Sequence, residues 1–299
     1  MTLRSNSEIK RRLPSLSRWA PSLIIGLMLS LCAPVVLADD DSRYLAMLDS
    51  ADLYMKGARW SSAEDMIRGA LRLRPALPTN YLLFSNLGVC LSAQGRYGDA
   101  LEAFEIGLLR APSDPRILLS RGKTYLAMRH DDDAEADFSA ALAADSTLLE
   151  PRRLRAQLRL IARKYDEAAS DFRAIMRLHP SEPWGPSGLA DCLQAAGDHE
   201  GALRLYRDAL TLETEPERRG DIYVGIVGAL IRLDRLYEAD DAVREAIRKM
   251  PRCGELYMMR SVLHRRRFQN EDAEIDKKMA MEYGVEPQIF AAVIESFSR

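Results

Sequence analysis

The sequence predicts an all-α fold of about seven helical hairpins in a row, closed by one further helix. An alanine recurs at nearly constant spacing, as Ala63, Ala100, Ala134, Ala168, Ala202, Ala239 and Ala273. The steps between these alanines are 37, 34, 34, 34, 37 and 34 residues. Repeats of about 20 to 50 residues are typical of solenoids, in which each unit covers the apolar face of its neighbour.

Other positions share this period. Twelve residues before the alanine the side chain is mostly small: Ala51, Gly88, Gly122, Ala156, Ala190, Val227 and Ser261. Four residues after it, six of the seven units have a large apolar residue: Ile67, Phe104, Phe138, Phe172, Tyr206 and Val243. Two antiparallel helices approach closely where side chains are small, and large neighbours fill the remaining grooves. Each unit is therefore expected to be a pair of packed helices.

The register places the boundaries of the units. They begin near Tyr44, Tyr81, Pro115, Leu149, Pro183, Gly220 and Gly254, within an array over residues 44–287. The turn between the paired helices is expected at Ala58, Gly95, Arg129, Arg163, Gly197, Asp234 and Phe268. The two 37-residue steps are expected to place three extra residues in loops, near Leu77-Pro78 and near Glu215-Pro216-Glu217.

Past the array, an apolar stripe at helical spacing predicts a capping helix over residues 288–299. Its members are Ile289, Phe290, Val293, Ile294 and Phe297. A stripe of this kind covers the open face of the last hairpin or docks a partner protein, and we favour the cap.

The N-terminus has the pattern of a secretory signal peptide over residues 1–38. Basic residues up to Arg18 precede an apolar run over residues 23–31, and cleavage is expected after Ala38. Residues 39–43 are then expected to form a short acidic linker, and the protein is expected to be exported to the periplasm or cell envelope. Two alternatives associate it with a membrane: an uncleaved signal anchor, or lipidation of Cys32, which follows a stretch resembling a bacterial lipobox.

Charge and motifs exclude several classes of function. Residues 1–38 have a net charge of +4, so −2 − 4 = −6 falls on the rest of the chain, which does not favour nucleic-acid binding. No zinc, calcium-loop, phosphate-loop or nucleophile-elbow motif is present. We therefore expect a protein that is not an enzyme and that has no cofactor or metal site. We interpret Cys90, Cys192 and Cys253 as small apolar residues of the core.

The repeat resembles the tetratricopeptide family, whose 34-residue unit has small residues at these places, over about residues 44–287. The resemblance implies a right-handed α-solenoid of about seven hairpins, in which the first helix of each unit lines a concave groove that binds partner segments. The expected groove residues lie in the middle units: Arg116, Lys123, Arg153, Gln157, Trp184 and Asp191. The basic members favour an acidic partner segment, and Trp184 is a candidate aromatic anchor.

We therefore expect a non-catalytic protein-interaction scaffold of the bacterial cell envelope. One alternative is an outer-membrane lipoprotein component of an assembly or secretion machine. A second alternative is a carbohydrate or small-molecule binding protein. A separate basic cluster, Arg260, His264, Arg265, Arg266 and Arg267, solvates the last hairpin or meets an anionic partner.

Overall fold

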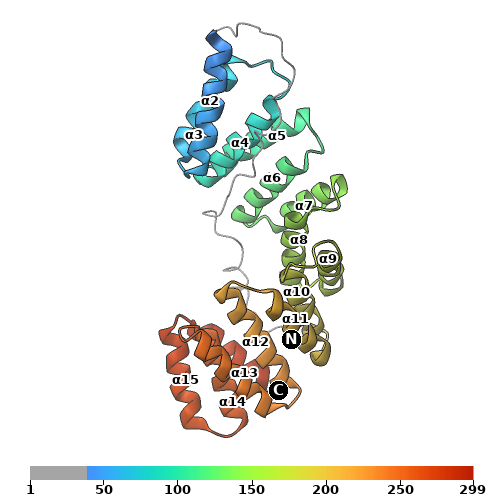
Figure 1. Cartoon of the computed structure of the whole chain (residues 1–299), viewed down its shortest axis with the longest axis vertical. Helices are drawn as coiled ribbons and strands as arrows, with labels where there is room; N and C mark the ends of the chain where they lie inside the picture. Colours follow the sequence, from blue (N-terminus) through green and yellow to red (C-terminus); the bar gives the residue numbers. More distant parts are fainter. Residues whose placement is uncertain (1–38, 299) are drawn as a thin grey trace. The chain divides into compact units, whose positions relative to one another are not determined.

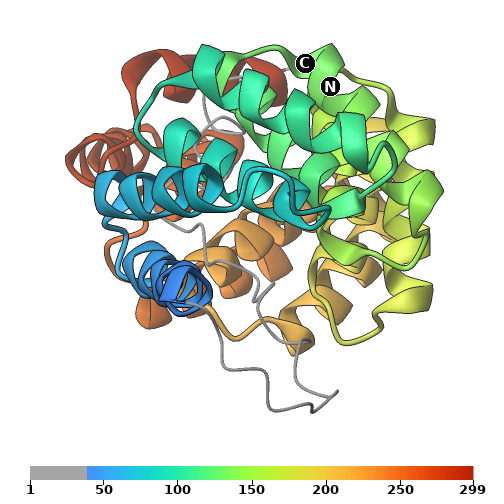
Figure 2. The same cartoon turned by 90° about the horizontal axis from the view of Figure 1, so that it is seen from above.

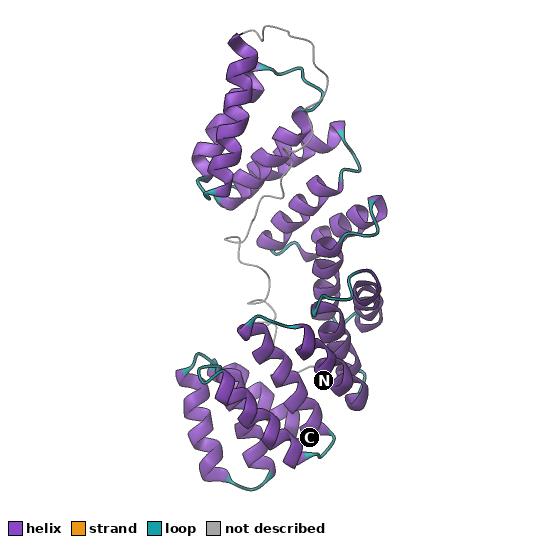
Figure 3. Cartoon of the chain, in the orientation of Figure 1, coloured by secondary structure: helices purple, strands orange, loops and turns teal. Residues whose placement is uncertain are grey.

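The computed structural model describes residues 39–298, which form fifteen helices and, within this range, no strand (Figure 1, Figure 3). The expected signal peptide over residues 1–38, its cleavage site and Cys32 lie outside the described residues. The chain divides into two compact units, and the boundary, between Pro151 and Arg152, falls inside one helix.

The N-terminal unit consists of consecutive hairpins. Its helices are α2 (Asp39–Lys56), α3 (Trp60–Leu73), α4 (Asn80–Ala93), α5 (Tyr97–Arg110), α6 (Pro115–Met128) and α7 (Asp131–Ala144). The boundary helix is α8 (Leu149–Ile161). The pairs α2/α3, α4/α5 and α6/α7 pack together, and Figure 2 shows the same helices from above.

The C-terminal unit continues the pattern. Its remaining helices are α9 (Tyr165–Leu178), α10 (Trp184–Ala195), α11 (His199–Leu212), α12 (Pro216–Arg232), α13 (Leu236–Lys249), α14 (Gly254–Arg266), α15 (Asn270–Glu282) and α16 (Pro287–Ser298). The pairs α10/α11, α12/α13 and α14/α15 pack together. We call the even-numbered helices up to α14 the first helices and their odd-numbered partners the second helices.

All seven turns have the left-handed backbone conformation at the residue that the register predicts. The φ angles lie between 53° and 86° at Ala58, Gly95, Arg129, Arg163, Gly197, Asp234 and Phe268. A left-handed residue after a helix reverses the chain within a few residues, which starts the second helix of each pair. Five of the seven are not glycine, although glycine adopts this conformation at the lowest cost.

The recurring alanines and large apolar residues form the core. Six of the seven alanines have no exposed surface and Ala273 is 1% exposed. In α6 the space over Gly122 is filled by Phe138, whose nearest ring atom lies 2.7 Å from where a Cβ would be. Phe172 and Tyr206 pack instead on a glycine of the following hairpin, Gly188 in α10 and Gly225 in α12 respectively. The small positions therefore set how closely the helices approach.

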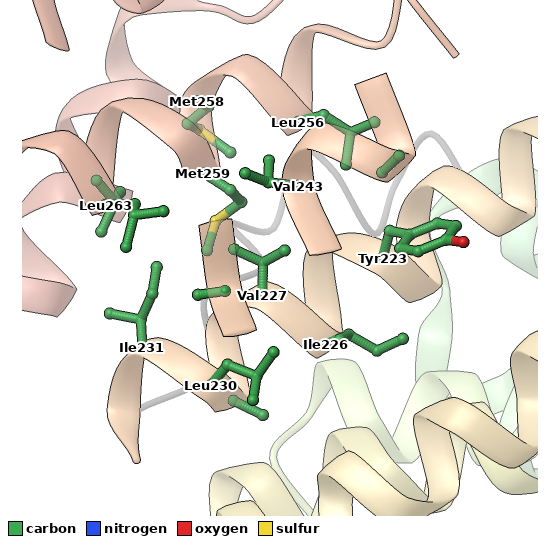
Figure 4. Close-up of a cluster of buried hydrophobic side chains, with 14 of the residues drawn as sticks. Tyr223, Ile226, Val227, Leu230, Ile231, Val243, Leu256, Met258, Met259 and Leu263 are labelled. Atoms are coloured by element: carbon green, nitrogen blue, oxygen red, sulfur yellow. The ribbon is translucent and has the colours of Figure 1, made fainter. Parts of the chain in front are cut away.

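The largest cluster of buried side chains lies in the C-terminal unit. Figure 4 shows members from α12, α13 and α14, with Val227, Val243 and Met259 close together. Helix α16 adds Ile289, Phe290, Val293 and Phe297, each 2–3% exposed. The apolar stripe therefore covers the last hairpin and is not available to a partner.

Three hairpins also share a buried ion pair between their two helices. The Arg121 guanidinium of α6 donates to both carboxylate oxygens of Asp137 in α7, at 2.8 and 2.7 Å. The same two-bond geometry joins α8 to α9 and α14 to α15, through Arg155–Asp171 and Arg260–Asp276. Each aspartate is 5% exposed or less.

These pairs occupy one place in the repeat. The arginine lies one residue before the small position of the first helix, and the aspartate lies three residues after the recurring alanine. In the hairpin α4/α5 the same two places hold Leu87 and Ala103, both buried. The fold thus accepts either a charged or an apolar pair at this contact.

Two expectations about the connections were wrong. Residues 39–43 form the beginning of α2 and not a linker, because aspartates at a helix N-terminus favour the helix dipole. Pro216 and Glu217 lie in the first turn of α12, which has 17 residues, and not in a loop. Proline suits the first position of a helix, so the extra residues lengthen α12. The other extra residues, near Leu77, do lie in a loop, between α3 and α4.

Candidate partner-binding surface

In the C-terminal unit, Trp184 lies between two arginines that come from neighbouring first helices. The Arg153 guanidinium of α8 lies 5.0 Å from the centre of the Trp184 ring, and that of Arg218 in α12 lies 5.8 Å from it. Trp184 is at the start of α10 and is half-buried. Cations within about 6 Å of an indole face are attracted by its ring electrons. We call Arg153, Trp184 and Arg218 the tryptophan stack.

Both arginines of the tryptophan stack are oriented by further hydrogen bonds. Arg153 donates to the side-chain oxygen of Gln157, one turn on in α8, at 3.2 Å. Arg218 donates to both carboxylate oxygens of Glu213, at 2.7 and 3.0 Å. The three side chains therefore present a flat apolar ring flanked by two oriented guanidinium groups, which suits an aromatic group of a partner, while a partner carboxylate would compete with Glu213 for Arg218.

Glu213 is buried, and two opposing effects act on its pKa. Burial raises the pKa, while hydrogen bonds from Arg218 and from the backbone N–H of Glu215 lower it. The net result is a pKa below the ordinary value of 4.5. The charged form of Glu213 is thus favoured by its partner in the tryptophan stack.

This shift predicts how the tryptophan stack responds to acid. Because the pKa of Glu213 is lowered in the folded state, its ion pair with Arg218 stabilises the fold fully above pH 4.5. This stabilisation is lost as the pH falls through the pKa of Glu213 in the folded state. With Trp19 and Trp60 replaced by phenylalanine, Trp184 is the one remaining tryptophan, and its fluorescence should change over that acid range as Arg218 is released. Glu213→Gln should remove this transition; a transition of the same size in that variant would contradict the assignment.

The other two expected residues of this unit are largely covered. Gln157 is 8% exposed and Asp191 is 9% exposed. Asp191 accepts a hydrogen bond of 2.6 Å from the Tyr206 hydroxyl of α11, so its carboxylate is directed to its own hairpin. Among the expected residues of the C-terminal unit, the half-exposed ones are therefore Arg153 and Trp184.

The two expected residues of the N-terminal unit are both held by carboxylates. Arg116, in the first turn of α6, donates to both carboxylate oxygens of Asp114, at 3.0 and 2.5 Å. The Lys123 ammonium lies 2.5 Å from a carboxylate oxygen of Glu150. A partner that binds either cation competes with an acidic neighbour already in place.

Helix α8 concentrates positive charge in the C-terminal unit. Arg155 and Arg159 both donate to Asp171 of α9, and a third arginine, Arg152, lies 3.4 Å from the same carboxylate. Asp171 itself is 3% exposed. These arginines connect the two helices of a hairpin, so their first role is to hold α8 against α9.

Arg218 is not among the groove residues that the sequence predicts, because the repeat register places it in a loop just before the sixth unit. The extension of α12 by Pro216 turns this stretch into helix and brings Arg218 over Trp184. The sequence did hold a signal for the extension, since proline followed by glutamate is typical of a helix N-terminus.

The basic cluster near residue 264 is divided among several acidic partners: Arg260 pairs with Asp276, Arg265 with Glu274 and Arg267 with Asp240.

The cysteines of the described residues are not paired in disulfides. Cys90 and Cys192 are buried and Cys253 is half-buried, and burial raises the pKa of all three thiols to about 12. Within residues 39–298 no group of three or more His, Cys, Asp and Glu side chains is arranged to hold a metal ion. None of the helices in this range is both long and apolar enough to span a bilayer.

Comparison with protein families connects the hairpins with known repeats. A family model described as "Tetratricopeptide repeat" matches residues 48–115, 86–148 and 119–183, and a second model of the same description matches residues 187–220. The matches thus continue from the first hairpin into α12.

Curated relatives match parts of larger proteins. The chain is 26% identical over 242 residues to the DnaJ homolog subfamily C member 7 homolog of Schizosaccharomyces pombe, covering 72% of this chain and 46% of that protein. It is 25% identical over 126 residues to human RNA polymerase II-associated protein 3, covering 42% of this chain and 19% of that protein. The chain therefore spans less than half the length of these relatives.

Solved structures show the same fold. A tetratricopeptide repeat protein from Parabacteroides merdae superposes with a TM-score of 0.64 at 20% identity, covering 86% of this chain and all of that one. Pseudomonas aeruginosa pilF superposes with a TM-score of 0.58 at 16% identity, covering 72% of this chain and 95% of that one. At such identities the likeness concerns the arrangement of helices.

Proposed function

The chain belongs to the tetratricopeptide repeat family, and we propose that it is an exported, non-catalytic scaffold of the bacterial cell envelope that binds segments of partner proteins. Proteins of this fold typically bind other proteins along their hairpins. Residues 1–38 support export, because they have the charge and apolar pattern of a signal peptide.

The observation that carries the binding role is the tryptophan stack. Interfaces are enriched in tryptophan and arginine, and oriented side chains lose little freedom when a partner binds. In the tryptophan stack Arg153 is oriented by Gln157 and Arg218 by Glu213. We propose that it binds a partner segment in which a carboxylate stands beside an apolar side chain.

Site-specific cross-linking in the native host tests this binding surface. A photoreactive amino acid at Ser187, one turn after Trp184 in α10, is expected to form an adduct with a specific protein. The same group at Arg204, exposed on the second helix α11, serves as the matched control. Reversing charge with Arg153→Glu and Arg218→Glu should reduce the Ser187 adduct at least about tenfold, because each contact contributes about 1–2 kcal/mol.

Two outcomes would contradict the proposal that the tryptophan stack binds a partner. Equal adducts from Ser187 and Arg204 would show that capture is not specific to the first helices. An adduct that survives both charge reversals would show that the tryptophan stack does not bind the partner. Arg116→Glu with Lys123→Glu, made as a separate variant, tests the cations of the N-terminal unit.

The proposed export of the protein can be tested by mass spectrometry. Mass spectrometry of the protein from its native host is expected to give a chain beginning at Asp39. A mass that retains residues 1–38 would indicate an uncleaved anchor. A lipid-modified Cys32 would instead indicate an outer-membrane lipoprotein.

A further inference from the structure

Two large aromatic residues in the C-terminal unit break the rule of the repeat. Phe268 stands at the turn position that in the other hairpins holds a small or charged residue: Ala58, Gly95, Arg129, Arg163, Gly197 and Asp234. Tyr237 stands at a position near the start of the second helix that otherwise holds Ser61, Gly98, Asp132, Asp166, Glu200 and Glu271. Phe268 is 90% exposed and Tyr237 is 86% exposed.

The Phe268 ring does not stabilise its own hairpin by packing, because it is 90% exposed. Its φ of 61° is a left-handed backbone conformation. A residue with a bulky side chain adopts this conformation at a cost in free energy, whereas glycine adopts it without that cost. Because its ring is exposed, packing within the hairpin does not offset that cost. All seven turns have this backbone conformation, so what sets Phe268 apart is a large exposed ring at a place where the other hairpins hold small or charged residues.

Arg267 contacts Tyr237 and directly precedes Phe268 in the chain. Its guanidinium lies 5.3 Å from the Tyr237 ring centre and donates to the backbone oxygen of Leu236 at 2.9 Å. It also lies 3.5 Å from a carboxylate oxygen of Asp240. Three contacts thus fix the arginine next to Phe268 in the chain. We call Tyr237, Arg267 and Phe268 the aromatic patch; tyrosine, arginine and phenylalanine are enriched in protein interfaces.

The charges around the aromatic patch have opposite signs before and after Phe268. Arg265 and Arg266 end α14, whereas Glu271 and Asp272 begin α15. Arg266, Glu271 and Asp272 are exposed, and within residues 39–298 none of them forms an ion pair. An anionic membrane or a nucleic acid would be attracted by one flank and repelled by the other.

A second copy of the same surface fits this pattern. In an isologous contact centred on the aromatic patch, a rotation by 180° would set the basic flank of one copy against the acidic flank of the other. The same contact would cover the exposed rings of Tyr237 and Phe268 and remove them from water. We propose that the aromatic patch binds a second copy of this chain and forms a two-fold dimer.

Removing the Phe268 ring tests the proposal with two readouts of opposite sign. The purified protein is expected to show a concentration-dependent monomer–dimer equilibrium in sedimentation velocity. Phe268→Gly should weaken dimerisation at least about tenfold. The same variant should raise the melting temperature of the dilute monomer by about 2 °C, because glycine relieves the left-handed strain.

A charge exchange tests the two-fold arrangement. Arg266→Glu and Glu271→Arg should each abolish self-association, because every contact between the flanks then joins like charges. An equimolar mixture of the two variants should form a heterodimer, because both contacts again join opposite charges. Leu109→Ser is the matched control: Leu109 is 81% exposed on α5, in the N-terminal unit, and this change should leave dimerisation unaltered.

Three results would overturn the proposal. A protein that stays monomeric at all accessible concentrations has no such interface. A dimer that persists at full strength in Phe268→Gly uses another surface. A mixture of the two charge variants that stays monomeric excludes the two-fold contact between the flanks. This result is also the one expected if the aromatic patch binds a different protein.

Discussion

Replacing Asp137 by alanine is expected to lower the free energy of unfolding by about 3 kcal/mol. Asp137 accepts two hydrogen bonds from Arg121, whose side chain is 21% exposed while that of Asp137 is 7% exposed. Removal of the carboxylate leaves a largely buried guanidinium without its partner, and the cost of desolvating that charge is no longer offset. Urea unfolding of the purified chain, followed by circular dichroism, measures the loss.

The repeat itself supplies the compensating variant. The hairpin α4/α5 holds Leu87 and Ala103 at the places of Arg121 and Asp137, and both residues are buried there. The double substitution Arg121→Leu with Asp137→Ala copies that apolar pair and should lie within about 1 kcal/mol of the unmodified chain. If the double variant is as unstable as Asp137→Ala alone, the apolar pair is not an equivalent solution in the hairpin α6/α7.

The fold could be predicted from the sequence where the repeat determines the backbone. All seven turn residues have the left-handed conformation at the places that the alanine register predicts. The alanines are buried because they lie where two helices meet, and this contact recurs in every hairpin. The ion pairs such as Arg121–Asp137 follow the same register, so they are visible in the sequence as charged residues at fixed places of the repeat.

The candidate surface was harder to predict, because register alone does not decide how much of a side chain is covered. Lys123, Gln157 and Asp191 all lie eight residues after the start of their units, yet only the long lysine side chain extends outward to a carboxylate. The shorter two are covered, and Asp191 is drawn to Tyr206. Arg218 depends on the extension of α12, which is local to one hairpin and so has no period to reveal it.

Replacing Gly188 by alanine is expected to destabilise the C-terminal unit by about 2 kcal/mol or more. A Cβ at this position of α10 would lie 2.2 Å from a ring carbon of Phe172, far inside van der Waals contact. The Phe172 side chain is 1% exposed and is held in the core, so it has no open space to move into. The gain of about 1 kcal/mol that alanine brings to a helix interior is therefore outweighed by overpacking.

A control and a rescue identify the cause. Gly98 lies in α5, where a Cβ would meet no atom within 4 Å apart from its chain neighbours and the nearby backbone of its own helix, so Gly98→Ala should instead stabilise the chain by about 0.5–1 kcal/mol. Phe172→Leu removes ring atoms and should recover part of the loss when it is combined with Gly188→Ala, although alone it leaves a cavity and destabilises. Thermal unfolding of the unmodified chain, the two single variants and the double variant yields the coupling between the two sites. Additive effects would show that the glycine is not required by the aromatic ring, and that the spacing of these hairpins is set elsewhere.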